Sequence, residues 1–380
     1  MTVIPHLIAG KPLSGSGGSP VFNPATGEQS ATVLSGGAAE IDAAVAAATA
    51  ALPGWAMTTP ARRAKVMFEI RRLLEARKDV RITTLDPPAE PKLETAIADA
   101  HAVFLWLEPI TEALLAKAPK LKMVSRYGVG YDTIDVEACT RHGVAVGVAN
   151  GSNDLSVAEH ALMLLLAVAR NTVAYDTRVR SGGWRGPGAP IMGELANRTV
   201  LVVGYGRIGT RVAKLCAAFG MKVMVHDPAF PTPRIAADGH IPAPDLRAAL
   251  PRADVLTLHC PLLPTTRNMI NAETIGLMKK GAWLINTARG PVVNQQALCD
   301  ALHSGHLAAA GLDVIAQEPP DPSDPILKAP NVTLAPHNAA QPVECLAKMA
   351  ERSAQNILDV FDGKADPGFY VNPEVFRRNA

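Results

Sequence analysis

Polar and reactive side chains follow four apolar segments in the second half of this 380-residue chain, among them Arg289, Glu318 and His337. A planar guanidinium can grip a carboxylate or carbonyl oxygen in a way that lysine cannot. Histidine is the natural proton donor near neutral pH, and a neighbouring carboxylate would orient its imidazole and favour the charged form. Taken singly, Arg289 could be a loop charge, Glu318 a solvated acid and His337 a core histidine. Their shared position at strand ends favours a common site.

The elements that must position these residues alternate between strand and helix. Strand-like segments in the second series cover 200–203, 222–227, 253–262, 281–290, 308–315 and 331–338, and an earlier series includes 101–107 and 144–150. Such alternation is typical of parallel sheets, in which ligands gather at the carboxyl ends of the strands. We therefore predict an α/β fold with two Rossmann- or flavodoxin-like parallel-sheet domains and an active-site cleft between them.

Several further elements are predicted from local patterns. Helical periodicity covers 38–52, 60–78, 154–180 and 342–363, and a short strand is expected over 79–86. The helix over 154–180 carries the run "ALMLLLAVA", which is too apolar for a face in contact with water. Dimerisation through this helix is therefore expected.

A glycine loop, "GYGRIG", joins the strand at 200–203 to a helix. Gly204 would allow a tight turn, Gly206 a close approach to a pyrophosphate, and Gly209 close packing of helix on strand. The next strand ends at Asp227, whose carboxylate can accept both ribose hydroxyls of NAD and would repel the 2′-phosphate of NADP. The whole unit predicts an NAD site.

Composition excludes several other classes. The 37 basic and 35 acidic residues give a net charge of +2 without a long basic run, which argues against nucleic acid and membrane partners. The five scattered cysteines are expected to be free thiols in a reducing cytoplasm. No signal peptide is visible, and the longest apolar run, 161–169, is too short to span a bilayer.

Several other polar residues are not expected to bind a metal or to take part in catalysis. His303 and His306 have no third ligand in sequence, so no metal site is predicted. Glu159 and His160 lie in an apolar helix and are expected to pack or cap. Cys260 has no evident activating partner and is interpreted as a lining residue.

The motifs together closely resemble the D-isomer-specific 2-hydroxyacid dehydrogenases. "RYGVGYDTID", "SVAEHALMLLL", "GYGRIG", "HCPLLPTTRNMI", "GAWLINTARGPVVNQQAL", "GLDVIAQEP" and "NVTLAPH" occur in the family's order, over roughly residues 80–365. The resemblance implies hydride transfer between NAD(H) and a small D-2-hydroxy acid or 2-keto acid. It assigns the catalytic roles to Arg289, Glu318 and His337.

The same resemblance implies the binding residues. It assigns the substrate to Asn153 and to a loop whose N–H groups bind the carboxylate, Arg126, Tyr127, Gly128, Val129 and Gly130. Asp313 is similar to the residue that holds the nicotinamide carboxamide. The implied cofactor-binding set is Gly204, Gly206, Arg207, Ile208, Gly209, Asp227, His259, Cys260, Pro261, Thr266, Thr287, Ala288, Asp313 and His337.

Residues 1–78 depart from that family. "VFNPATGE" and "PARRAKVMFEIRRLLEARKD" resemble the start of an aldehyde dehydrogenase of the methylmalonate-semialdehyde type, without its catalytic cysteine. The predicted organisation is a fragment over 1–78, a substrate domain over 79–152 completed by 342–365, and an NAD domain over 153–341. The substrate domain lacks the family's usual first strand and part of its first helix.

Substrate and role stay open in three respects. The segment "FLWLEPIT" offers no cation to a phosphate, and Glu108 would repel one, which favours an unphosphorylated 2-keto acid such as hydroxypyruvate or glyoxylate. Arg126 leaves a phosphoglycerate-type substrate open. An NAD-sensing binding protein of corepressor type, or an inactive fusion that retains NAD binding, is the alternative to an enzyme. The expected partners are a small-molecule substrate and a second copy of the chain.

Overall fold

The computed structural model describes five strands between residues 2 and 34, residues 79–83, and residues 92–377. The chain divides into two compact units, Met1–Arg81 and Ile82–Ala380. In the first unit, β5 (Gln29–Leu34) pairs with the parallel β1 (Thr2–Ile4) and the antiparallel β4 (Gly18–Phe22). A separate antiparallel pair joins β2 (His6–Ile8) to β3 (Lys11–Leu13).

Two sequence predictions near this unit have different outcomes. The helices predicted over 38–52 and 60–78 lie outside the described residues. The strand predicted over 79–86 is wrong for its described part, because 79–83 form a turn and irregular backbone. Residues 79–83 have strand propensity, but no described strand pairs with them. A segment forms a strand only where a neighbouring strand supplies hydrogen bonds.

The second unit contains a seven-stranded parallel sheet in the order β11-β10-β9-β12-β13-β14-β15. β12 and β13 are buried along their whole length, as expected for parallel strands covered on both faces. The chain starts at β9, moves outward to β10 and β11, and then returns to β12 on the other side of β9. The order reverses at this point, where ligands bind in open α/β sheets. The strands are β9 (Thr199–Val203), β10 (Lys222–His226), β11 (Ile241–Pro242), β12 (Val255–Leu258), β13 (Ala282–Asn286), β14 (Leu307–Leu312) and β15 (Val332–Leu334).

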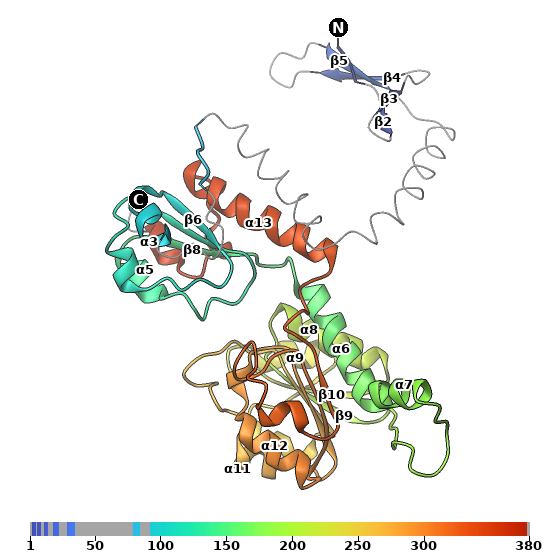
Figure 1. The fold of residues 1–380 in the computed structure, drawn as a ribbon. Helices are drawn as coiled ribbons and strands as arrows, with labels where there is room; N and C mark the ends of the chain where they lie inside the picture. Colours follow the sequence, from blue (N-terminus) through green and yellow to red (C-terminus); the bar gives the residue numbers. More distant parts are fainter. Residues whose placement is uncertain are drawn as a thin grey trace. The chain divides into compact units, whose positions relative to one another are not determined.

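Helices cover both faces of this sheet (Figure 1). Alternate residues of β9 point to opposite sides: Leu201 joins one core with α10, α11 and α12, and Val202 joins another with α6 and α8. The result is a three-layer α/β/α lobe. Its helices are α6 (Asp154–Arg170), α7 (Thr172–Arg180), α8 (Arg207–Ala218), α9 (Thr232–Ala237), α10 (Leu246–Ala249), α11 (Ala272–Gly276) and α12 (Gln295–His303), with short 3-10 turns at Leu250–Arg252, Gly290–Val292 and Pro325–Lys328.

The helix predicted over 154–180 is broken. Asn171 adopts a left-handed conformation (φ 48°) that ends α6, and α7 continues at a bend of 59°. Asparagine tolerates this conformation better than most residues. No single helix in the described part of the chain is long and apolar enough to cross a membrane, and α6 with α7 pass that test only as a bent pair.

The apolar run of α6 is also less exposed than the sequence suggested. Ala161, Leu164, Leu165 and Val168 are buried against the chain's own sheet and α8. Part of this face is therefore covered within the chain itself, and dimerisation through it stays a prediction. Exposed apolar side chains remain at its other positions and in the following segment: Leu155, Met163, Val173, Val179, Trp184, Ile191 and Met192.

A smaller parallel sheet, in the order β6-β7-β8, forms the other lobe of the second unit. The C-terminal helix α13 packs on β7 and β8, where Ser125 Oγ donates to the Ser353 carbonyl (2.7 Å) and Asn356 Nδ2 to the Val148 carbonyl (3.0 Å). The elements are α3 (Lys92–Ala96), β6 (Ala102–Leu105), α4 (Glu112–Leu115), β7 (Met123–Arg126), α5 (Val136–Arg141), β8 (Ala145–Val148) and α13 (Val343–Phe361), with 3-10 turns at Ile97–Asp99, Pro367–Phe369 and Pro373–Arg377. The predicted α/β fold with parallel sheets is confirmed.

Candidate active site

The glycine loop has the geometry of a dinucleotide cradle. Gly204 has φ 92°, and a Cβ there would lie 2.7 Å from the Cys260 nitrogen. A Cβ on Gly209 would lie 1.9 Å from the Gly204 carbonyl oxygen, whereas one on Gly206 would meet nothing within 4 Å. No side chain of the described residues caps the N-terminus of α8, so its first N–H groups are available to a phosphate. The residues present therefore fit NAD.

The geometry of the glycine loop predicts that alanine at Gly209 affects stability, whereas alanine at Gly206 affects NADH binding. Gly209→Ala should destabilise the fold by about 1–3 kcal/mol, because its methyl group meets rigid backbone. Gly206→Ala should leave the unfolding midpoint unchanged and raise the Kd for NADH, because its methyl group points into the open cradle. Thermal melts and NADH fluorescence titrations of both variants measure this. The reverse pattern would contradict the assignment.

Asp227 closes the cradle at the end of β10. Its Oδ2 accepts from the Tyr205 N–H (2.7 Å) and its Oδ1 from the Ala229 N–H (2.9 Å). These bonds fix a half-buried carboxylate beside the glycine loop. This is the position expected of a residue that hydrogen-bonds the hydroxyls of the adenosine ribose.

Hydrogen bonds hold the residues at the ends of the neighbouring strands in place. His259 bridges the hydroxyls of Thr257 (Nε2, 2.8 Å) and Thr287 (Nδ1, 3.2 Å). Desolvation lowers the pKa of His259 to about 3, so this imidazole stays neutral. Burial raises the pKa of the Cys260 thiol to about 11, which agrees with a lining role. Thr266 Oγ1 donates to the Pro261 carbonyl (2.7 Å) and steadies the loop after β12.

His337 and Glu318 form a direct pair. His337 Nδ1 lies 2.6 Å from Glu318 Oε2, and both side chains are a little over one-third exposed. Glu318 Oε1 accepts from the Ile315 N–H (3.1 Å). His337 Nε2 makes no hydrogen bond to any described residue, so one ring nitrogen is oriented and the other is free. This is the arrangement that a general acid–base requires.

Arg289 reaches the loop of the smaller lobe. Its Nε donates to Asp132 Oδ1 (2.9 Å) and its Nη1 to the Ala288 carbonyl (2.8 Å). A Cβ on Gly130 would lie 1.4 Å from Arg289 Nη2, so only glycine leaves room for the guanidinium. Burial by itself would raise the pKa of Asp132, but Arg289 and Arg126 lower it below its usual value. Asp132 is therefore the counter-ion of Arg289.

The rest of the predicted substrate loop surrounds this contact. Arg126 is buried, its Nη1 donates to the Tyr127 carbonyl (2.7 Å), and a Cβ on Gly128 would overlap that guanidinium. Tyr127 Oη donates to the Leu346 carbonyl (3.0 Å). Val129 lies half-buried in the same loop. Asn153 is buried and is the first residue of the turn that starts α6.

A short chain of backbone contacts connects Arg289 to the His337–Glu318 pair. A Cβ on Gly290 would lie 1.8 Å from the Ile315 carbonyl oxygen, so the turn after Arg289 packs on the loop that holds Glu318. Asn286 stiffens the turn, since its side chain accepts from the Ala288 N–H (2.9 Å) and donates to the Arg289 carbonyl (3.0 Å). The structure thus places the three predicted catalytic residues on connected segments.

Three residues of this framework were missed from the sequence. Asp132 lies inside the "RYGVGYDTID" motif, so its acidic type next to the glycines could have indicated it. Asn286 ends a buried strand, where a polar residue signals a bond to the following turn. His160 was assigned to packing, yet its Nε2 lies 3.3 Å from Asp313 Oδ1.

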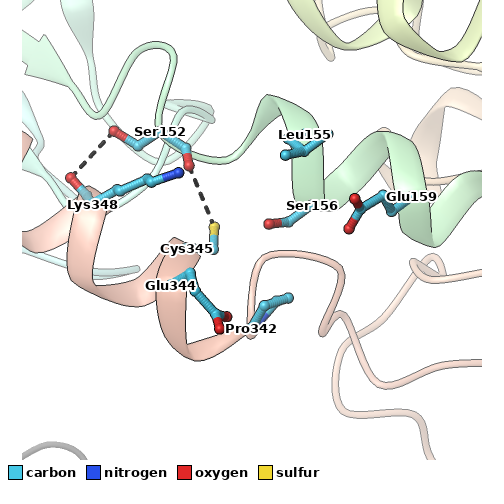
Figure 2. A pocket seen from close by; sticks show the side chains of 8 residues that line it. All are labelled: Ser152, Leu155, Ser156, Glu159, Pro342, Glu344, Cys345 and Lys348. Atoms are coloured by element: carbon cyan, nitrogen blue, oxygen red, sulfur yellow. Dashed lines mark hydrogen bonds between the residues drawn. The ribbon is translucent and has the colours of Figure 1, made fainter. Parts of the chain in front are cut away.

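A cavity of about 390 Å³ lies where α6 and α13 begin (Figure 2). Ser152, Ser156, Glu344 and Cys345 are among its lining residues, and Ser152 Oγ donates to the Lys348 carbonyl (3.3 Å) across it. None of the predicted site residues lines it.

Comparisons with known proteins agree with this geometry. The model of the NAD-binding domain of D-isomer specific 2-hydroxyacid dehydrogenases matches residues 162–339, and that of the aldehyde dehydrogenase family matches residues 14–97. The glyoxylate reductase of Thermofilum pendens is 38% identical over 295 residues, which is 77% of this chain and 87% of that protein. The D-3-phosphoglycerate dehydrogenase of Mycobacterium bovis is 39% identical over 304 residues, 78% of this chain and 57% of that protein.

A solved structure gives the same picture. The D-lactate dehydrogenase of Aquifex aeolicus, complexed with NAD and lactic acid, is 31% identical and has a TM-score of 0.73 over 80% of this chain and 96% of that chain. A chain with this fold, this cradle and these relatives is an NAD-dependent oxidoreductase that acts on CH–OH groups. It belongs to the D-isomer specific 2-hydroxyacid dehydrogenase family, with a match to the aldehyde dehydrogenase family at its N-terminus.

Proposed function

We propose that the protein reduces a small unphosphorylated 2-keto acid, such as glyoxylate or hydroxypyruvate, with NADH. The observation that carries this proposal is the His337–Glu318 pair, whose free Nε2 can give a proton to the substrate oxygen. Arg289, held by Asp132, would bind the substrate carboxylate and polarise the carbonyl. The glycine loop and Asp227 would hold the cofactor, which supplies the hydride.

The loop after β6 supports the choice of an unphosphorylated substrate. Trp106 and Leu107 are about half exposed and carry no charge. Glu108 Oε2 accepts from the N–H groups of both (2.8 and 3.1 Å), which keeps an acid in this loop. Relatives named glyoxylate reductase and D-3-phosphoglycerate dehydrogenase represent the two substrate types.

Steady-state turnover of NADH tests the substrate. We expect a higher kcat/KM with glyoxylate and hydroxypyruvate than with phosphohydroxypyruvate. A preference for the phosphorylated acid would overturn the substrate proposal and would indicate that Arg126 binds the phosphate. If none of the three acids supports NADH oxidation, the protein would be an NAD-binding protein without this activity.

Cofactor choice is expected to depend on Asp227. The parent protein should prefer NADH to NADPH, and Asp227→Ala should reduce that preference about tenfold, which corresponds to about 1.4 kcal/mol. The matched control is Asp238→Asn, which changes the carboxylate that accepts from the Tyr205 hydroxyl (2.9 Å). Equal use of both cofactors by the parent would contradict this role.

The domain bounds also remain a proposal. The contacts of Ser353 and Asn356 with β7 and β8 support a substrate domain over 79–152 that is completed by 342–365, beside an NAD domain over 153–341. The proposed N-terminal fragment over 1–78 precedes both in the sequence. The five cysteines form no disulfide with one another, which supports a cytoplasmic protein.

A homodimer through α6, α7 and the segment after them is the further part of this proposal. Met163, Val173, Trp184 and Ile191 are 45%, 58%, 67% and 91% exposed, which is costly for apolar side chains left in water. Light scattering should give twice the chain mass, and Met163→Glu with Val173→Glu should give the single-chain mass. A parent protein that is monomeric at micromolar concentration would contradict the dimer.

A further inference from the structure

Asp313 holds the turn that carries the catalytic histidine. Its Oδ1 accepts from the Asn338 N–H (2.9 Å), its Oδ2 from the Ala339 N–H (3.2 Å), and its main-chain carbonyl from the His337 N–H (2.8 Å). One residue therefore binds three consecutive N–H groups. Each carboxylate oxygen accepts one of these hydrogen bonds from the protein itself.

The turn needs such a restraint. His337 has φ 51°, a left-handed conformation that costs a non-glycine residue about 1–2 kcal/mol. Strained backbone of this kind persists only where its surroundings over-determine it. Without the Asp313 bonds, the turn could relax and move the His337 ring away from Glu318.

The His160 ring faces the Asp313 carboxylate. It lies on α6, 14% exposed, with Nε2 3.3 Å from Asp313 Oδ1, and the Asp313 side chain is 1% exposed. That nitrogen makes no well-aligned hydrogen bond to any described residue. Burial raises the pKa of Asp313, but His160 and the Asn338 N–H lower it below its usual value, so the carboxylate stays ionised.

We propose that His160 is a positioning residue of this enzyme. By holding the buried Asp313 carboxylate on the 337–339 turn, it keeps the His337 imidazole against Glu318 and its Nε2 free for the substrate. The inference rests on the proposed role of His337 as the proton donor. It gives α6 a part in the reaction through Asp313, without contact between His160 and the substrate.

Three variants test the proposal. His160→Leu removes the N–H at similar size, His160→Gln keeps an N–H donor near the Nε2 position, and Glu159→Gln alters the exposed neighbour as a matched control. We expect His160→Leu to lower kcat for keto-acid reduction about 10- to 100-fold, the loss typical of a misplaced catalytic group. KM for the keto acid and Kd for NADH should stay at parent values, and His160→Gln should recover most of the rate.

Asp313→Asn adds a coupling test. Its rate should fall as in His160→Leu, and the double variant should be no slower than the slower single variant, because the two residues act as a unit. Parent kcat in His160→Leu, or equal losses in the leucine and glutamine variants, would overturn the proposal. A loss of NADH binding together with a lower unfolding midpoint would show a merely structural role and would overturn it too.

A second readout separates this inference from the proposed function. The His337 imidazole signal in NMR spectra of the full chain is assigned by its disappearance in His337→Gln. His160→Leu should shift that signal, and Glu159→Gln should not. If the parent reduces no keto acid, the proposed function fails, while a shifted signal still supports the positioning role. An unmoved signal contradicts it.

Discussion

Replacing His337 with glutamine is expected to lower kcat for keto-acid reduction by about 10²- to 10⁴-fold, the usual contribution of a positioned general acid. The reason is that Nε2 of His337 is the free nitrogen of a ring whose other nitrogen Glu318 holds at 2.6 Å. Glutamine can bond to Glu318 but cannot deliver a proton at neutral pH. Stopped-flow or steady-state oxidation of NADH measures the loss.

Two further variants make this prediction specific. Glu318→Gln should lose less than His337→Gln, because it leaves the imidazole in place. His142→Gln changes a histidine that is paired with Glu112 in the other lobe and should keep the parent rate. NADH should bind all three variants with parent affinity. A His337→Gln variant that keeps its kcat would mean that another group donates the proton.

Arg289→Lys is expected to have the second-largest effect. Lysine cannot reproduce the fork in which Nε binds Asp132 and Nη1 binds the Ala288 carbonyl while Nη2 lies over Gly130. A lost hydrogen bond to a charged group costs about 1.5–3 kcal/mol, or about 10- to 100-fold in kcat/KM for the keto acid. The loss should appear mainly in KM, because substrate binding is affected first.

Asp132→Asn is the matched control for Arg289. It keeps an acceptor for Arg289 Nε but removes the counter-charge, so its effect on KM should be smaller than that of Arg289→Lys. An unchanged KM in Arg289→Lys would mean that Arg289 does not bind the substrate. Equal effects of both variants would instead assign the main role to Asp132.

The parts of the fold that follow from local patterns were predicted well. Buried parallel strands are apolar throughout, and a glycine loop between strand and helix is a short-range signal, so β9, α8 and β10 were found with nearly correct ends. The polar residues at the strand ends followed from the same pattern, because a parallel sheet brings its carboxyl ends to one edge.

Contacts between distant segments could not be found this way. Arg289 and Asp132 are 157 residues apart in the chain, and the pairing of His160 with Asp313 joins a helix to a strand that comes much later. Hydrophobic periodicity places such residues on an element but does not identify the opposite partner. His160 was therefore assigned to packing, although the position on α6 was correct.

The break at Asn171 and the missing strand at 79–83 have the same origin. The "NT" step after Arg170 is compatible with a continuous helix, and the bend also depends on the Asn171 side chain, which donates to the Ile191 carbonyl twenty residues later. The stretch at 79–83 has strand propensity, but a strand forms only where a neighbouring strand supplies hydrogen bonds. Tertiary contacts decided both cases.

Deuterium-labelled NADH tests whether this chain transfers a hydride from NADH to C2 of a 2-keto acid. With hydroxypyruvate as substrate and the labelled reduced cofactor, we expect glycerate that carries the deuterium at C2 and consists of the D-isomer alone, as read by mass spectrometry and chiral chromatography. NADH that binds stoichiometrically but leaves hydroxypyruvate, glyoxylate and phosphohydroxypyruvate unreduced would show that the protein is not a 2-keto acid reductase.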